Sequence, residues 1–145
     1  MRKFVLAVSA IVLVTGAAFA DVIADRQAVM KQNGRDIGAL APYAKGEKPY
    51  DAAEVLALLT ALNDNVQAID VPALWPAGSE GGDTESSPKI WDDMPAFQAA
   101  MDKFKADAAA AVAAAPVDLD AFKAQFGAIA SNCGSCHQTF RVDKG

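Results

Sequence analysis

Two cysteines and one histidine stand close together in the stretch "SNCGSCHQTF", residues 131–140. They are Cys133, Cys136 and His137, and the 145-residue sequence contains no other cysteine or histidine. On a helix, residues three and four positions apart share one face, so the two thiols and the imidazole would lie near one another. Thiols can form thioethers or a disulfide, and an imidazole can bind a metal ion. This spacing therefore points to cofactor attachment, metal binding or a disulfide.

The order Cys-x-x-Cys-His is the signature of covalent c-type haem attachment. Two thiols on one helix face can add to the two vinyl groups at one edge of a porphyrin, and the adjacent imidazole can then reach the iron. A thioredoxin-like site would need a preceding strand, structural zinc usually takes four N/S ligands, and a simple disulfide leaves the histidine unexplained. We therefore predict one haem c, covalent through Cys133 and Cys136, with His137 as the metal ligand.

Four segments with helical periodicity are expected to position this motif, and no segment has the pattern of a strand. The first runs from about residue 22 to 40, the second from Asp51 to before Pro72, the third from 94 to Pro116 and the fourth from about 118 to 142. In the fourth, seven residues recur at alternating spacings of 3 and 4, which places both cysteines on the core-facing seam: Leu119, Phe122, Phe126, Ile129, Cys133, Cys136 and Phe140. The pattern predicts an all-α protein, an antiparallel four-helix bundle with covalently attached haem.

A long connection separates the second and third segments, "VPALWPAGSEGGDTESSPKIWD" at residues 71–92. Loops of this length are uncommon in compact domains and are often functional. It contains both tryptophans of the sequence, Trp75 and Trp91. These side chains either close the end of the core or lie along the edge of a cofactor.

The beginning of the sequence has the organisation of a secretory signal peptide. Arg2 and Lys3 are followed by an apolar run at residues 4–14 and by "AFA" at residues 18–20. The alternative is a retained membrane anchor, but the apolar run is shorter than the roughly 20 residues that span a bilayer. We expect cleavage of residues 1–20.

The remaining residues, 21–145, form one predicted domain that is exported to the periplasm without a membrane anchor. Loss of Arg2 and Lys3 lowers the basic residues from 13 to 11 against 18 acidic ones, a formal net charge of −7. No basic, aromatic-rich patch is present, so nucleic acid is excluded as a partner.

Beyond the motif, the sequence resembles the cytochromes c′, which are class II c-type cytochromes with a haem motif near the C-terminus. The resemblance spans nearly all of residues 21–145 and rests on four stretches: "DRQAVMK" in the first segment, "PYDAAEV" opening the second, "EGGD" with "KIWDD" in the connection, and "CGSCHQTFR" in the last. It implies an up-down-up-down bundle. It also implies a homodimer that packs through the first two helices.

The resemblance implies further cofactor contacts. Arg26 and Gln27 match positions that contact the haem propionates, and a guanidinium suits a carboxylate. Glu80 and Asp83 match a loop near the haem edge. Arg141 matches a basic residue beside the proximal imidazole. By position alone, Arg26 would be a solvated surface residue, and Arg141 would be a cation favourable to the last helical turn.

The sixth iron position depends on Met30. No methionine follows the motif and no second histidine exists, so both of those ligands are excluded. In the resembling family, the position of Met30 holds a large apolar side chain that covers the distal face without binding. We therefore favour five-coordinate, high-spin iron. The alternative is a low-spin form in which Met30 is the sixth ligand, as in other members of the class.

Three functions follow from these alternatives. The favoured one is a periplasmic haem protein that binds NO or CO and is capable of electron transfer with a redox partner protein. The second is a low-spin electron carrier with Met30 on the iron. The third is a helical binding module with a disulfide and no haem. No nucleophile–base pair is present in the pattern, so we do not expect an enzyme.

Overall fold

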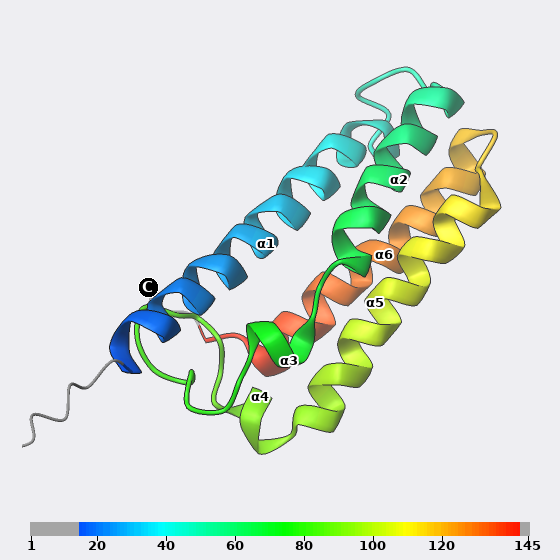
Figure 1. Ribbon diagram of the computed structural model, residues 1–145. Helices are drawn as coiled ribbons and strands as arrows, with labels where there is room; N and C mark the ends of the chain where they lie inside the picture. Colours follow the sequence, from blue (N-terminus) through cyan, green and yellow to red (C-terminus); the bar gives the residue numbers. More distant parts are fainter. Residues whose placement is uncertain (1–14, 143–145) are drawn as a thin grey trace, which may run out of the picture.

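The computed structural model describes residues 15–142, and all the regular elements in this range are α-helices (Figure 1). The helices are α1 (Thr15–Ala44), α2 (Ala52–Gln67), α3 (Val71–Leu74), α4 (Lys89–Asp92), α5 (Met94–Ala114) and α6 (Leu119–Phe140). The predicted all-α, four-helix architecture is confirmed. Its four long members are α1, α2, α5 and α6.

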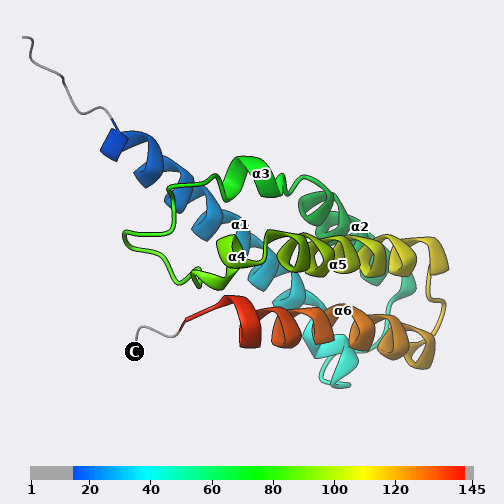
Figure 2. The same ribbon diagram turned by 90° about the horizontal axis from the view of Figure 1, so that it is seen from below.

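The four long helices form a bundle in which sequence neighbours run antiparallel (Figures 1 and 2). Helix α1 packs against α2 and α6, and α5 packs against the same two helices. The order around the bundle is therefore α1, α2, α5, α6. Helices α3 and α4, with the segment that joins them, lie at the end of the bundle where α6 finishes (Figure 2). This end is the one that carries the cysteine–histidine motif.

Aspartates begin three of the long helices. Asp51, Asp93 and Asp118 precede α2, α5 and α6, and each side chain accepts a backbone N–H two or three residues later, at 2.8–3.1 Å. Such a cap contributes about 1 kcal/mol to helix stability. The predicted helix starts near these residues are confirmed. Glu54, three residues after Asp51, lies with its Oε1 2.6 Å from Lys48 Nζ in an ion pair.

Several boundaries differ from the prediction. The first helix begins at Thr15 and not at about residue 22, and the second ends at Gln67 and not directly before Pro72. The first helix extends past residue 40 to Ala44, because its last turn accommodates Pro42 and the chain leaves the helix only at Gly46, where φ is 72°. The predicted loop at residues 71–92 contains two helices of four residues each. Asp70 caps the first of these by accepting the N–H of Ala73 at 3.1 Å. The connection is thus partly helical.

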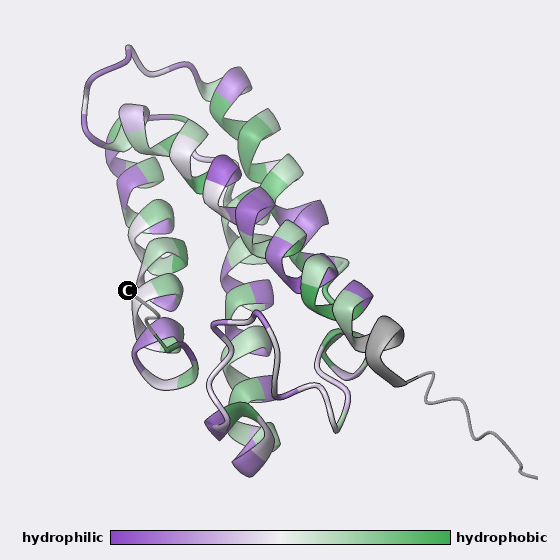
Figure 3. Ribbon diagram, turned by 90° about the vertical axis from the view of Figure 1, so that its left-hand side faces the viewer, coloured by the Kyte–Doolittle hydropathy of each residue, from purple (hydrophilic) through white to green (hydrophobic). Residues whose placement is uncertain are grey.

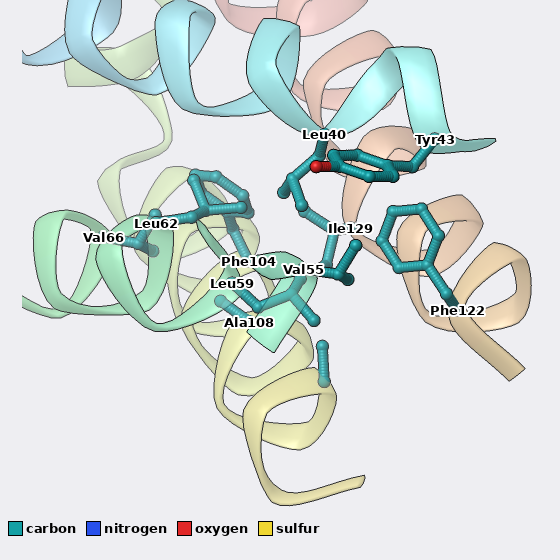
Figure 4. Close-up of a cluster of buried hydrophobic side chains, with 11 residues drawn as sticks. Leu40, Tyr43, Val55, Leu59, Leu62, Val66, Phe104, Ala108, Phe122 and Ile129 are labelled. Atoms are coloured by element: carbon teal, nitrogen blue, oxygen red, sulfur yellow. The ribbon is translucent and has the colours of Figure 1, made fainter. Parts of the chain in front are cut away.

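Hydrophobic side chains concentrate on the inward faces of the helices (Figure 3) and form two clusters. The first cluster draws on all four long helices (Figure 4): Leu40, Tyr43, Val55, Leu59, Leu62, Val66, Phe104, Ala108, Ala111, Phe122 and Ile129. The second cluster lies at the α3–α4 end: Ile69, Val71, Trp75, Ile90, Phe97, Met101 and Phe140. Three residues of the predicted seam of α6 are among these buried side chains: Phe122, Ile129 and Phe140.

The end of α6 is joined to the connection between α3 and α4. The N–H of Ser87 donates to the carbonyl of Phe140, and the N–H of Val142 donates to the carbonyl of Glu85, both at 2.9 Å. Ser86 and Arg141 form an isolated antiparallel bridge between these two bonds. The backbone that follows the motif is thereby fixed against the loop.

The turn between α5 and α6 lies at the opposite end of the bundle (Figure 1). Ala115 closes α5 in the left-handed conformation, with φ 41° and ψ 61°. It is the non-glycine residue with positive φ within the described range. The hydroxyl of Tyr50 donates to the carbonyl of the next residue, Pro116, at 2.6 Å. The backbone is therefore strained at Ala115, and a hydrogen bond from Tyr50 holds the following residue in place.

The predicted signal peptide lies largely outside the described residues, which take in only its last six positions, at the start of α1. Between residues 15 and 142, none of the helices combines the length and the apolar character needed to cross a bilayer.

Candidate haem site

The two cysteines of the motif are half-buried on the last turns of α6, and both are free thiols. Cys136 packs against the second cluster. Burial raises the pKa of both thiols, with the nearby Cys133 as a further cause at Cys136. Both groups are therefore protonated thiols at neutral pH. Their half-burial agrees with the predicted core-facing seam.

His137 follows directly after Cys136 in the last turn of α6 and is exposed. Partial desolvation of the imidazole lowers its pKa, and the positive charge of Arg141 lowers it further, while Glu85 acts in the opposite direction. These causes favour the neutral ring, which is the form that binds a metal. The side chain therefore suits the role of a ligand from the α6 side.

Arg26 is buried, with 3% of its surface exposed, and not solvated as its position alone would indicate. Its guanidinium donates to the carbonyl of Ser79 at 3.1 Å, and also to the Ser79 hydroxyl and the Leu74 carbonyl. It lies 5.8 Å from the ring centre of Trp75 and 5.4 Å from that of Trp91, within cation–π range. Burial lowers its pKa, and the charge of Glu80 partly offsets this. Arg26 thus fixes the connection to α1.

The other predicted loop contacts lie beside Arg26. Gln27 Nε2 donates to the backbone carbonyl of Asp83 at 2.9 Å. Glu80 Oε1 accepts the N–H of Gly78 at 2.9 Å. Backbone hydrogen bonds lower the pKa of Glu80, and Arg26 lowers it further. An open cavity of about 450 Å³ is lined by Gln27 and Asp83 together with the small residues around them. The structure therefore brings Arg26, Gln27, Glu80 and Asp83 to one place.

Met30 lies one turn after Arg26 on α1 and is half-buried. Its side chain packs against the second cluster, as Cys136 of α6 does. The methionine and the motif therefore border the same group of hydrophobic side chains from two different helices. This is the placement that a residue covering the far side of a cofactor requires.

Arg141 forms an ion pair with Glu85, with 2.6 Å between Nε and Oε2. Both side chains are largely exposed, so the pair contributes little to stability. Its position just after α6 brings a positive charge near His137. The sequence placed Arg141 near the imidazole but gave no indication of the contact with Glu85, which is 56 residues away.

Sequence reasoning missed Asn132, which is buried next to Cys133. Its amide Nδ2 donates to Asp107 Oδ2 of α5 at 2.7 Å and to the carbonyl of Ala128 at 3.0 Å. Lys103 also binds Asp107, one turn away on α5. The network joins α5 to α6 beside the motif. The sequence signal that could have identified Asn132 is its position three residues after Ile129, which places it on the same inward face of α6.

These residues fit a covalently held haem. The two half-buried thiols suit the vinyl edge of that group, and the adjacent imidazole suits its iron. The apolar second cluster suits the faces of the ring, and the buried guanidinium suits the propionates. Within the part of the chain that the structure describes, no group of three or more His, Cys, Asp or Glu side chains is placed to hold a metal ion.

Similar sequences agree with this reading. The family model described as Cytochrome C′ matches residues 21–141. A cytochrome c′ of Rhodopseudomonas palustris is 42% identical over 149 residues, covering 98% of this chain and 99% of the relative. A cytochrome c-556 of Agrobacterium fabrum is 39% identical over 133 residues, covering 91% of this chain and 89% of the relative.

Solved structures have the same fold. Cytochrome c prime from Shewanella frigidimarina is 32% identical and covers 86% of this chain and 97% of its own, with a TM-score of 0.79. A nitric oxide complex of a mutant cytochrome c prime from Alcaligenes xylosoxidans is also 32% identical, covers 88% and 98%, and has a TM-score of 0.78. The matched family model and these relatives show that the chain belongs to the cytochrome c′ family, which implies haem c as its cofactor.

Proposed function

We propose that this chain is an exported, periplasmic haem c protein that binds NO or CO at its iron and transfers electrons to a redox partner protein. In this proposal, Cys133 and Cys136 hold one haem and His137 is the metal ligand. The observation that carries it is the pair of half-buried free thiols beside an imidazole at the end of α6. We expect a carrier and binder, not an enzyme.

The side chains of α6 would hold the cofactor as follows. Cys133 and Cys136 would each hold the group through a thioether, formed by addition of the S–H across one vinyl double bond with no oxidant consumed. The helix keeps the two sulfur atoms three residues apart on one face. His137, held neutral by its surroundings, presents its imidazole beside them. When bound, haem supplies an iron that changes oxidation state and takes a small ligand.

Arg26 is the candidate partner for the propionates. Its guanidinium offers five N–H donors, and the four hydrogen bonds to the Leu74 carbonyl and to the carbonyl and hydroxyl of Ser79 leave one donor for a further acceptor. Gln27, Glu80 and the backbone of Asp83 would border this edge. Arg141 would keep a positive charge near the proximal imidazole, which opposes protonation of that ring.

Met30 is the candidate cover of the sixth position, and we propose that it covers the iron without binding it. The apolar second cluster, against which it packs, offers a dry surface for a small ligand. A related protein of known structure holds nitric oxide, which supports gas binding here. The side chain would then have to move before NO or CO reaches the iron, and methionine is flexible enough to do so.

The second candidate is a six-coordinate electron carrier with the Met30 thioether on the iron. One observation favours it: Met30 and Cys136 pack against the same cluster, so the sulfur lies on the side of the bundle that the motif faces. Methionine and histidine together are the axial ligands of many cytochromes c. Such an iron would exchange electrons without first binding a gas.

One preparation tests both candidates. The chain is expressed with a cytochrome maturation system, and its haem is assayed after denaturation. Ferric absorption and EPR spectra of high-spin iron, with binding of CO and NO to the ferrous protein, support the first candidate. A low-spin spectrum with a methionine–iron charge-transfer band supports the second. Absence of covalent haem overturns both and leaves the disulfide-containing binding module.

Two further parts of the proposal have direct measurements. N-terminal sequencing of the exported protein should begin at Asp21, the residue at which the family match also begins. Sedimentation should give a homodimer, which we propose to pack through α1 and α2. A monomer at micromolar concentration would contradict the dimer but not the haem site.

A further inference from the structure

Asn33 is a buried polar residue of α1, with 7% of its surface exposed. Among the residues that the structure describes, neither its amide nitrogen nor its amide oxygen has a hydrogen-bond partner. An unsatisfied buried polar group costs about 1–3 kcal/mol, so native proteins rarely keep one without a use. Both polar atoms of the Asn33 amide are therefore available to a group that the described residues do not supply.

The polar neighbours of Asn33 are already satisfied by one another. Gln32 Nε2 donates to Asp36 Oδ1 at 2.7 Å, and Asn65 Nδ2 of α2 donates to Asp36 Oδ2 at 2.7 Å. This network joins α1 to α2, and Asn33 takes no part in it. Two amides near the same helix junction are thus paired, whereas the more deeply buried one is not.

The inward seam of α1 shows where Asn33 lies. Buried and half-buried residues recur along it at spacings of 3 and 4: Ile23, Arg26, Met30, Asn33, Ile37 and Leu40. Asn33 is therefore three residues after Met30 on the same face, and their side chains are neighbours. A group that is covered by the Met30 side chain would therefore lie beside the Asn33 amide as well.

The two clusters give the level of Asn33 along the bundle. At the α3–α4 end, Met30 and Cys136 both pack against the second cluster. Further along, Ile37 packs against the first cluster, which contains Ile129. Because α1 and α6 run in opposite directions (Figure 1), Asn33 falls between these two levels, as Cys133 does on α6. The unpaired amide thus lies at the level of the first cysteine of the motif.

We propose that Asn33 is the hydrogen-bonding residue on the distal side of the haem, where its Nδ2 donates to the outer atom of a diatomic ligand. The proposal rests on the proposed function for the haem itself. It assigns two parts to α1: Met30 supplies the apolar cover and Asn33 the polar contact. The ligand class is a small molecule whose outer atom accepts a hydrogen bond.

Carbon monoxide is the probe for this contact, in haem-loaded protein with Met30→Ala. That substitution opens the sixth position whether or not the thioether binds iron, so a ligand complex forms in either case. A donor at the outer oxygen lowers the C–O stretching frequency. Adding Asn33→Leu should therefore raise this frequency in the infrared spectrum and speed CO dissociation roughly two- to tenfold, as expected for one net hydrogen bond.

Asn65→Leu in the same background is the matched control, because its amide is paired with Asp36 on α2. It should leave the frequency and the dissociation rate unchanged. Asn33→Val, which also lacks a hydrogen-bond donor and has no sulfur that could bind the iron, repeats the test if the leucine variant does not fold. An unchanged frequency and rate on loss of Asn33 would overturn this proposal alone. A chain that acquires no haem would overturn the proposed function as well, and the two failures are distinguished by the haem assay.

Discussion

The two hydrophobic clusters differ in what they are made of and in what surrounds them. The first cluster is assembled from the four long helices and contains no charged residue. The second draws on α3, α4, α5 and α6, and like the first it contains no charged residue and three aromatic side chains: Trp75, Phe97 and Phe140. Arg26 and the buried hydroxyl of Ser79 lie beside it. The two ends therefore differ in the buried charged and polar groups that border the second cluster, and not in the aromatic content of the clusters themselves.

The largest expected effect is the loss of covalent haem when the motif at the α3–α4 end of the bundle is changed. Changing both Cys133 and Cys136 to Ala should abolish covalent haem, because no thiol remains to form a thioether. Haem staining of a denaturing gel measures this. Ser135→Ala, an exposed change between the two cysteines, is the control and should keep full staining. Covalent haem in the double variant would disprove the assignment.

The first cluster should respond through stability. Phe122→Ala removes a fully buried ring and should lower the free energy of unfolding by about 3–5 kcal/mol. Denaturant unfolding followed by circular dichroism measures the loss. The haem absorption spectrum should stay the same, since this residue lies at the other end of the bundle.

Phe97→Ala is the matching change in the second cluster, where this ring packs at 4.9 Å from Trp75 and 5.2 Å from Phe140. It should lower stability and also shift the haem spectrum. If Phe122→Ala shifted the spectrum as much, the contrast between the two ends would be wrong.

A smaller effect is expected at Arg26. Arg26→Met keeps the aliphatic volume but leaves the carbonyls of Leu74 and Ser79 without their charged donor. Stability should fall by about 2 kcal/mol, with faster proteolysis of the connection. Limited proteolysis and denaturant unfolding provide the two readouts. Arg35→Met, an exposed change on the same helix, should alter stability by less than about 0.5 kcal/mol.

The smallest effect concerns pH, at the boundary between the two ends. The hydrogen bond from Asn132 and the ion pair with Lys103 lower the pKa of Asp107. Its stabilisation is thus complete above the unfolded carboxyl pKa of about 3.9 and is lost as the pH falls through the folded value. Asp107→Asn should flatten this acid limb and cost up to about 1 kcal/mol at neutral pH. Unfolding measured from about pH 7 to pH 3 tests it. Asp102→Asn, an exposed change on the same helix, should keep the limb.

The helices and the motif could be predicted because their signals are local. Aspartate caps act within three residues, and the seam of α6 repeats every three or four. The residues of α1 that face the interior are harder to predict from hydrophobicity. Arg26 and Asn33 are polar, yet both are buried at positions where the helical period expects apolar residues. Such buried polar residues can be predicted only if the inward positions are assigned from the helical spacing of 3 and 4 residues and not from hydrophobicity.

The course of the long connection could not be predicted. Arg26 meets Ser79 across 53 residues, and Arg141 meets Glu85 across 56. These contacts depend on backbone turns that have no period. At Gly82, φ is 88° and a Cβ atom would lie 2.9 Å from Ile23 Cδ1, so the loop approaches α1 only because this residue is glycine.

Ala115 has a consequence for how this chain could change through evolution or design. A left-handed alanine costs about 1 kcal/mol relative to an unstrained residue, and this one lies in a turn at the end of the bundle opposite α3 and α4. Proteins that are stable enough to work are under little selection to remove such strain. Mutations near Met30 and Asn33 that change ligand preference could lower the stability of the fold. A substitution at Ala115 that relieves its strained backbone, such as glycine, could restore that stability without touching the motif.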